Sequence, residues 1–175
     1  MSRERLLHLF DRMEGERQAL LRKLDALPPG RLAQRPANGG WSAAQVMTHL
    51  AIAEEGSLAY LNKKREFKKH GPVGLSTTLR LLVLNTGIQL PLKYKAPTII
   101  ADVPATSYAV ARERWDRVRT RMRSTYEELP EALIGHDLFK HPFMGRFNLV
   151  QAVGFMRHHM RRHRAQIERT LASLG

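Results

Sequence analysis

The chain has 175 residues and no cysteine, and its 29 Lys and Arg against 16 Asp and Glu give a formal net charge of +13. Its length predicts one domain covering residues 1–175. Without cysteine there can be no disulfide, no thiolate zinc site and no thiol nucleophile from the protein, so a metal site must use histidine or carboxylate, and thiol chemistry needs an external thiol.

The N-terminal segment MSRERLLHLFDRMEGER is charged throughout and lacks the apolar stretch of a secretory signal. The longest apolar run, residues 79–92, is shorter than the roughly 20 residues that span a bilayer and includes an arginine. We therefore expect a cytoplasmic protein that does not cross a membrane.

Two helices are predicted in the first half of the chain. Apolar residues recur every three or four positions over residues 2–27, which is typical of an amphipathic helix, and the prolines and glycine of 28–30 end it. Ser42 and Gln45 have the spacing of a capping box, so a second helix should begin at Ala43 and continue to about Lys68. Its inward stripe includes His49 and Tyr60.

The second half predicts three more segments. An apolar stretch over 77–90 should be helical, and 93–104 should form an extended crossover. A long helix over 105–129 should bury a stripe from Val110 to Leu129, and Asn148 should cap a last helix that ends near residue 174. Because 135–147 reads as a loop and no segment alternates with period two, we expect an all-α, four-helix bundle with long crossover connections.

Three histidines fall on the predicted inward faces of two helices. His159 and His163 are four residues apart, so their side chains lie one above the other with Cβ atoms about 5–6 Å apart. That separation lets both imidazoles reach one ion at about 2.0–2.1 Å. His49 lies three residues after the apolar Val46. The three rings could share one ion and leave a coordination position open, which is typical of a reactive site.

Simpler interpretations stand beside this one. Histidine pairs four residues apart are common on helix surfaces, and a backbone carbonyl can satisfy a buried imidazole. His158 would replace His159 if the helix register were shifted by one residue. Glu54 and Glu55 could orient a ligand, although solvated helix charges are the simpler explanation. Surface roles are expected for the remaining histidines, which are His8, His70, His136 and His141.

Four short blocks, in order along the chain, resemble the DinB-like superfamily. They are WSAAQVMTHL (41–50), KAP (95–97), HPFMGRFNL (141–149) and H-x3-HRAQI (159–167). The resemblance implies a right-handed four-helix bundle of up-down-down-up connectivity. It also implies a metal triad with one histidine on the second helix and two on the last, which fall on His49, His159 and His163.

Characterised members of this superfamily include thiol S-transferases and thiol-dependent isomerases, and others have been assigned as metal-dependent hydrolases. The resemblance therefore implies one divalent metal ion, zinc or nickel, that activates a low-molecular-weight thiol for transfer to a small-molecule substrate. Four arginines near the triad could attract carboxylates of such a thiol, although most of them should lie on the solvent-exposed face of the helix. These are Arg157, Arg161, Arg162 and Arg164. No further catalytic residue is predicted.

Two alternatives remain open. The same ligands and open position would serve a metal-dependent hydrolase. From a different class, the +13 charge would suit a basic helical protein that binds nucleic acid without catalysis. Aromatic residues make up 7% of the chain and no recognition motif is present, so we do not expect a nucleic-acid partner. An apolar outer stripe such as 79–92 could pair two chains as a homodimer.

Overall fold

The computed structural model describes residues 1–66, 71, 73, 103–141 and 145–175. The predicted helix at 77–90, the apolar stretch at 79–92 and most of the predicted crossover at 93–104 lie outside these residues. Four long helices dominate the described part: α1 (Arg3–Asp25), α3 (Ala43–Arg65), α6 (Tyr108–Glu128) and α8 (Leu149–Ala172). The predicted α fold class is confirmed.

Polar side chains cap these helices where the sequence predicts their first turns. Ser42 Oγ accepts from the Gln45 backbone N–H and Gln45 Oε1 accepts from the Ser42 N–H, which completes the predicted capping box. Asn148 and Gln151 form a second capping box at the start of α8. Each box satisfies backbone donors that have no partner within the helix. The starts of the two helices that carry the three histidines are therefore fixed locally.

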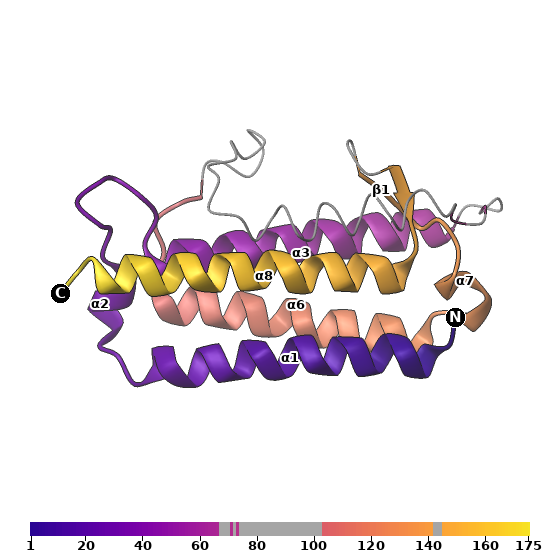
Figure 1. Cartoon of the computed structure of the whole chain (residues 1–175), viewed down its shortest axis with the longest axis horizontal. Coiled ribbons are helices and arrows are strands. Elements are labelled where there is room, and N and C mark those ends of the chain that lie inside the picture. Colours follow the sequence, from indigo (N-terminus) through magenta and orange to yellow (C-terminus); the bar gives the residue numbers. More distant parts are fainter. Residues whose placement is uncertain (67–70, 72, 74–102, 142–144) are drawn as a thin grey trace.

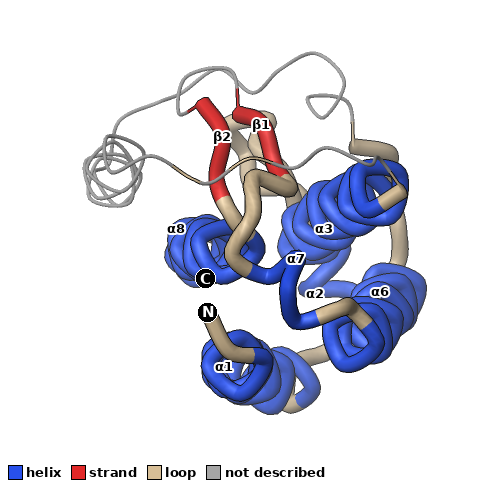
Figure 2. The backbone as a smooth tube through the Cα atoms, turned by 90° about the vertical axis from the view of Figure 1, so that its right-hand side faces the viewer, coloured by secondary structure: helices blue, strands red, loops and turns tan. Residues whose placement is uncertain are grey.

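The helices form a four-membered bundle with two parallel pairs. In Figure 1, α1 and α8 run in one direction while α3 and α6 run in the other, which is the up-down-down-up order. Seen end-on in Figure 2, the helices follow the order α1, α6, α3, α8 around the bundle. The principal contacts join these neighbours. Consequently α3 and α8 are adjacent and antiparallel, although about 80 residues separate them in sequence.

The connections contain short elements that the sequence did not reveal. Two short helices, α2 (Pro29–Ala33) and α7 (Glu131–Ile134), follow α1 and α6. Strands β1 (Phe139–His141) and β2 (Gly145–Phe147) pair antiparallel within the segment expected to be a loop. That expectation was wrong because three residues are too few to establish a period-two pattern. The parallel rings of Phe139 and Phe147, 5.8 Å apart, pack together across the hairpin.

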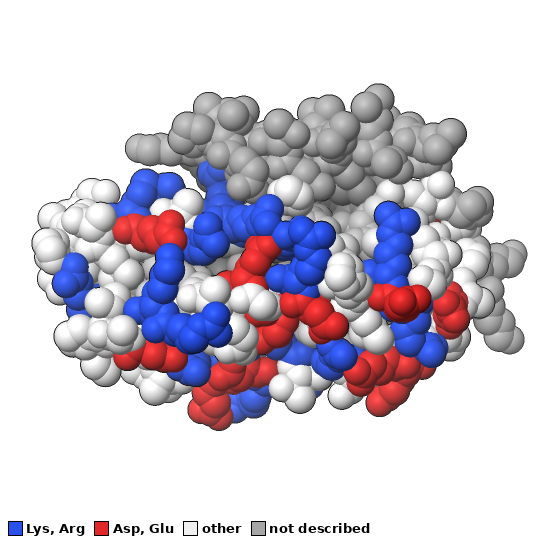
Figure 3. All heavy atoms as spheres, turned by 60° about the horizontal axis from the view of Figure 1, so that its bottom comes forward, with Lys and Arg blue, Asp and Glu red and all other residues white. Residues whose placement is uncertain are grey.

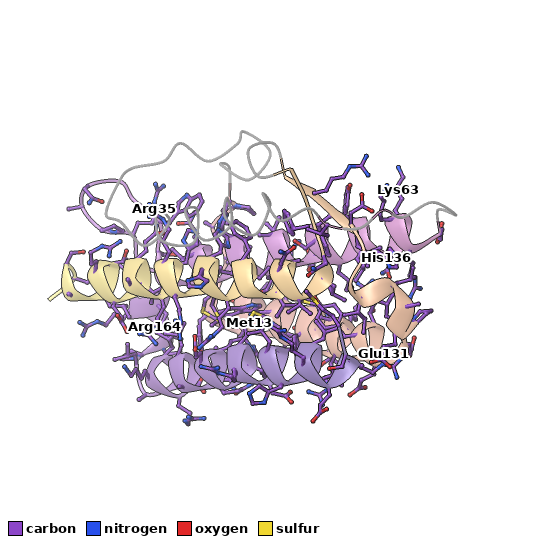
Figure 4. The ribbon with its side chains drawn as sticks, turned by 45° about the vertical axis from the view of Figure 1, so that its right-hand side comes forward. Met13, Arg35, Lys63, Glu131, His136 and Arg164 are labelled. Atoms are coloured by element: carbon purple, nitrogen blue, oxygen red, sulfur yellow. The ribbon has the colours of Figure 1, made fainter. Side chains whose placement is uncertain are left out.

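The core lies between the four helices. Met13 of α1 has no exposed surface and lies in the interior of the bundle (Figure 4). Along α6 the buried face contains Tyr108 and Trp115, whereas Val110 is 57% exposed. The predicted inward position of Val110 was wrong because it falls out of phase with the three- and four-residue spacing of the buried face. Tyr60 is also exposed, whereas its neighbour Leu61 is fully buried, so the predicted inward position of Tyr60 was wrong.

Charges of both signs cover the face formed by α1 and its neighbours. Figure 3 shows basic and acidic side chains interleaved there. Pairs between helices include Arg17 with Asp116 at 2.6 Å and Arg161 with Glu16 at 2.6 Å. This face is therefore not uniformly basic despite the net charge. Separately, none of the helices in the described ranges combines the length and the apolar character needed to cross a membrane.

Candidate metal centre

The three predicted histidines meet between α3 and α8. His49 lies in the second turn of α3 and is 2% exposed. His159 and His163 are one turn apart on α8 and partly buried. Since α3 and α8 pack against each other, these side chains come together from two helices that are distant in sequence. Each ring can offer one nitrogen so that all three nitrogens lie within 4.8 Å of one another.

The rings are close in every pairing. The centroid of His49 lies 5.4 Å from that of His159 and 4.6 Å from that of His163, while the two rings on α8 are 4.5 Å apart and nearly perpendicular. The Nε2 atoms of His159 and His163 are separated by 3.1 Å. This arrangement is a compact triangle of imidazoles rather than a row along a helix surface.

The triangle has the dimensions of three ligands to one ion. Ligands bound at 2.0–2.1 Å in a tetrahedron lie about 3.3–3.4 Å from one another. The 3.1 Å between the two Nε2 atoms is close to this value. All three nitrogens lie within 4.8 Å of one another, so two of them would have to approach by at most about 1.5 Å to bind the same ion. Rotation of the side chains can supply this movement. Three donors on one side also leave a fourth direction for another ligand.

Burial keeps the two imidazoles of α8 in the neutral form that binds metals. Burial, and the nearby His163 and His49, lower the pKa of His159 well below its ordinary value. Burial together with the field of His49 lowers the pKa of His163 to about 4, even though its contact with Gln166 acts in the opposite direction. At pH 7 both rings are therefore neutral, and each has a lone pair on one nitrogen. The donor set fits a divalent ion such as zinc or nickel.

Aromatic and amide side chains surround the triangle. The Trp41 ring, from the loop before α3, lies 5.0 Å from His49, and Phe155 stacks on His159 at 6.2 Å. Gln166 Oε1 is 2.8 Å from Nδ1 of His163. Gln166 belongs to the H-x3-HRAQI block, but the sequence predicted no role for it. Its position three residues after His163, on the same helix face, was the available signal.

The carboxylates of α3 do not join the triangle. Glu54 is 3% exposed and accepts hydrogen bonds from Arg119 and Trp115 of α6. The expectation of a solvated charge was wrong for Glu54, because α6 supplies buried donors that the sequence of α3 cannot reveal. Glu55 pairs with Arg114 at 2.6 Å. Within the described residues, the group of potential metal ligands contains histidine alone.

Most of the arginines near the triad have carboxylate partners. Arg157 and Arg161 both donate to Glu16 of α1, and Arg164 lies 3.6 Å from Glu168. Arg162 lies close enough for its charge to lower the pKa of His159 and His163, after the larger effect of burial. Arg157 and Arg161 therefore stabilise the contact between α1 and α8.

The other histidines do not enter the cluster. His158 is partly buried, and burial together with Arg161 lowers its pKa, but His159 is the residue of this pair that reaches the triangle. The one-residue register shift is thereby ruled out. His8 is exposed, and Nδ1 of His136 contacts the Ala132 carbonyl at 2.5 Å. His70 and the side chain of His141 lie outside the described residues.

Comparisons with known proteins support the fold and identify the family. A search of curated proteins gave no match. YfiT from Bacillus subtilis, described as a probable metal-dependent hydrolase with an unusual four-helix bundle topology, resembles this chain with a TM-score of 0.53 and 17% identity. The similarity covers 99% of this chain and 87% of YfiT. The family model of the DinB superfamily matches residues 3–167, and the chain therefore belongs to the DinB superfamily.

Proposed function

We propose that this protein is a metal-dependent enzyme that binds one divalent ion, zinc or nickel, through His49, His159 and His163. The observation that carries the proposal is the convergence of three imidazoles from two separate helices, with nitrogens within 4.8 Å of one another. A divalent ion in such a site supplies Lewis-acid chemistry and lowers the pKa of a ligand at its open position.

The surroundings of the triangle favour a thiol as the activated ligand. In the described part of the chain, no Asp or Glu joins the potential ligands, and Glu54 and Glu55 are paired with arginines. The site therefore offers no carboxylate base among these residues. A thiol has an ordinary pKa of about 8.5 and needs less help to ionise than water. Since the chain has no cysteine, the thiol must be an external, low-molecular-weight one.

The proposed reaction is transfer of this thiol to a small electrophilic substrate, an S-transferase-type activity. In this reaction His49, His159 and His163 hold the ion, and the aromatic rings of Trp41 and Phe155 shield the ligand imidazoles from water. Hydrolysis is the second candidate. It is favoured by the similarity to YfiT, whose description names a metal-dependent hydrolase, and it would use the same three ligands.

Metal content tests the first part of the proposal. Untagged protein loaded with zinc or nickel and then desalted should retain about one ion per chain by elemental analysis, and His163→Ala should retain almost none. His158→Ala is the matched control, because this neighbouring histidine lies outside the triangle and its loss should leave metal content unchanged. Full metal content in the His163→Ala protein would refute the assignment of the ligands.

Activity measurements test the second part. The metal-loaded protein should accelerate consumption of a small thiol by 1-chloro-2,4-dinitrobenzene, and the His163→Ala protein should not. Hydrolysis of a p-nitrophenyl ester, measured in parallel without thiol, distinguishes the two reactions. Ester hydrolysis without any thiol consumption would replace the S-transferase proposal with the hydrolase.

A further inference from the structure

We infer that Gln166 is a positioning residue that fixes the tautomer of His163, so that Nε2 of this ring presents its lone pair to the other two histidines. The inference deepens the proposed function and rests on it for its consequence, which is tighter metal binding. The observation behind it is the 2.8 Å contact between Gln166 Oε1 and Nδ1 of His163.

The chemistry of the two groups determines the direction of this hydrogen bond. The amide oxygen of Gln166 can only accept, so Nδ1 of His163 carries the hydrogen and donates it. A neutral imidazole carries its hydrogen on one nitrogen only, so Nε2 then has none. This same Nε2 atom lies 3.1 Å from Nε2 of His159. The nitrogen that faces the triangle is therefore the one left available for an ion.

Helix geometry makes the contact intrinsic to α8. Gln166 follows His163 by three residues, and residues at this spacing lie on the same face of a helix. The next residue, Ile167, is fully buried in the core and anchors this turn of the helix. Gln166 thus reaches the outer nitrogen of His163 without any movement of another element.

Aromatic rings pack against the other two histidines. His49 packs against Trp41 and His159 stacks on Phe155. Ring packing restrains the plane of an imidazole, but it does not choose which nitrogen carries the hydrogen. A hydrogen bond to the outer nitrogen makes that choice. Gln166 therefore gives His163 a constraint that ring packing cannot provide.

The first experiment measures the tautomer in metal-free protein by long-range ¹H–¹⁵N NMR of labelled histidines. In the wild type, His163 should carry its hydrogen on Nδ1. Gln166→Met, which keeps the length and loses the acceptor, should release His163 into a mixture of tautomers, and Gln166→Glu should restore the Nδ1–H form. An Nε2–H ring in the wild type, or an unchanged ring in Gln166→Met, would overturn the inference.

The second experiment measures zinc affinity by competition with a chromophoric chelator. Loss of a partner to a metal-bound histidine typically weakens binding by about 10- to 100-fold, so we expect this change for Gln166→Met and for the shorter Gln166→Asn, with rescue by Gln166→Glu. Gln34→Met, at an exposed position, is the control and should bind as the wild type does. Circular dichroism checks that each variant is folded.

The two experiments separate the two claims. If the wild type binds no zinc, the proposed function fails, and the tautomer measurement still decides the role of Gln166. If the wild type binds zinc and Gln166→Met binds it equally tightly, the proposed function stands and the positioning role is refuted.

Discussion

A buried ion pair between α3 and α6 should be essential to the stability of the bundle. Glu54 and Arg119 each have side chains only 3–4% exposed. Arg119 donates to both carboxylate oxygens of Glu54, at 2.7 and 2.6 Å, and Trp115 donates its indole N–H at 3.0 Å. The carboxylate is thus removed from water and depends on these donors. Removing Arg119 should be costly.

The expected cost follows from the charge left behind. In Arg119→Met, Glu54 stays buried with the indole N–H of Trp115 as its remaining donor among those described above. Breaking one side of a buried ion pair typically costs about 3–5 kcal/mol of unfolding free energy. In a chain of this size, each kcal/mol lowers the melting temperature by about 2–4 °C. We therefore expect a decrease of roughly 6–20 °C.

Urea denaturation followed by circular dichroism measures the change. Arg117→Met is the matched control on the same helix, because Arg117 pairs with Glu113 where both side chains are 67% exposed. Such surface pairs contribute about 0–1 kcal/mol. The double variant Glu54→Leu, Arg119→Met should recover much of the loss, since neither charge of this pair is left buried without its partner. A cost for Arg119→Met as small as that of the control would refute the reasoning.

Three further predictions concern acid stability, metal binding and helix capping. Although burial raises the pKa of Glu16, hydrogen bonds from Arg161 and Arg157 lower it from 4.5 to about 2. The ion pairs of Glu16 should therefore stabilise the fold fully above about pH 4.5. Their contribution to the unfolding free energy, roughly 1–2 kcal/mol after solvent screening, should be lost as the pH falls towards 2. Glu16→Gln should flatten this part of the acid denaturation curve, and an unaltered curve would contradict the assignment. Zinc at 100 times its dissociation constant should raise the unfolding free energy of the wild type by about 2.7 kcal/mol, whereas an equal rise in His163→Ala would mean that the ion binds elsewhere. Ser42→Ala should cost about 1 kcal/mol in urea denaturation because it removes the cap of α3, and no measurable cost would show that the cap is dispensable.

The sequence predicted the long helices because their patterns are local. Apolar spacing depends on the helix repeat, and caps such as Ser42 with Gln45 use hydrogen bonds between residues three apart. These interactions form wherever the segment is placed. The same locality explains the failures. Strands of three residues are too short to show an alternating apolar pattern. Val110 lies in the first turn of α6, next to its cap, where an error of one position in the assumed helix phase turns a side chain from the core to solvent.

The candidate site was predictable only in part. The spacing of His159 and His163 placed them on one face of α8, and the apolar stripe of α3 placed His49 on an inward face; the family resemblance implied the same three residues. Gln166 was visible in the sequence at the correct spacing, but nothing there showed that its amide would meet the outer nitrogen of His163 rather than water. That contact depends on the rotamers of both side chains, which packing around α8 determines.

The sequence by itself determined where the helices begin, which faces are apolar and which histidines could share an ion. Tertiary structure alone decided that α3 and α8 lie side by side, so that His49 meets two rings about 110 residues further along the chain. It also decided that Glu54 is held by Arg119 in the core and does not reach the triangle. The physical reason is that spacing along a helix fixes a direction around its own axis, whereas the neighbour found in that direction depends on how all four helices pack.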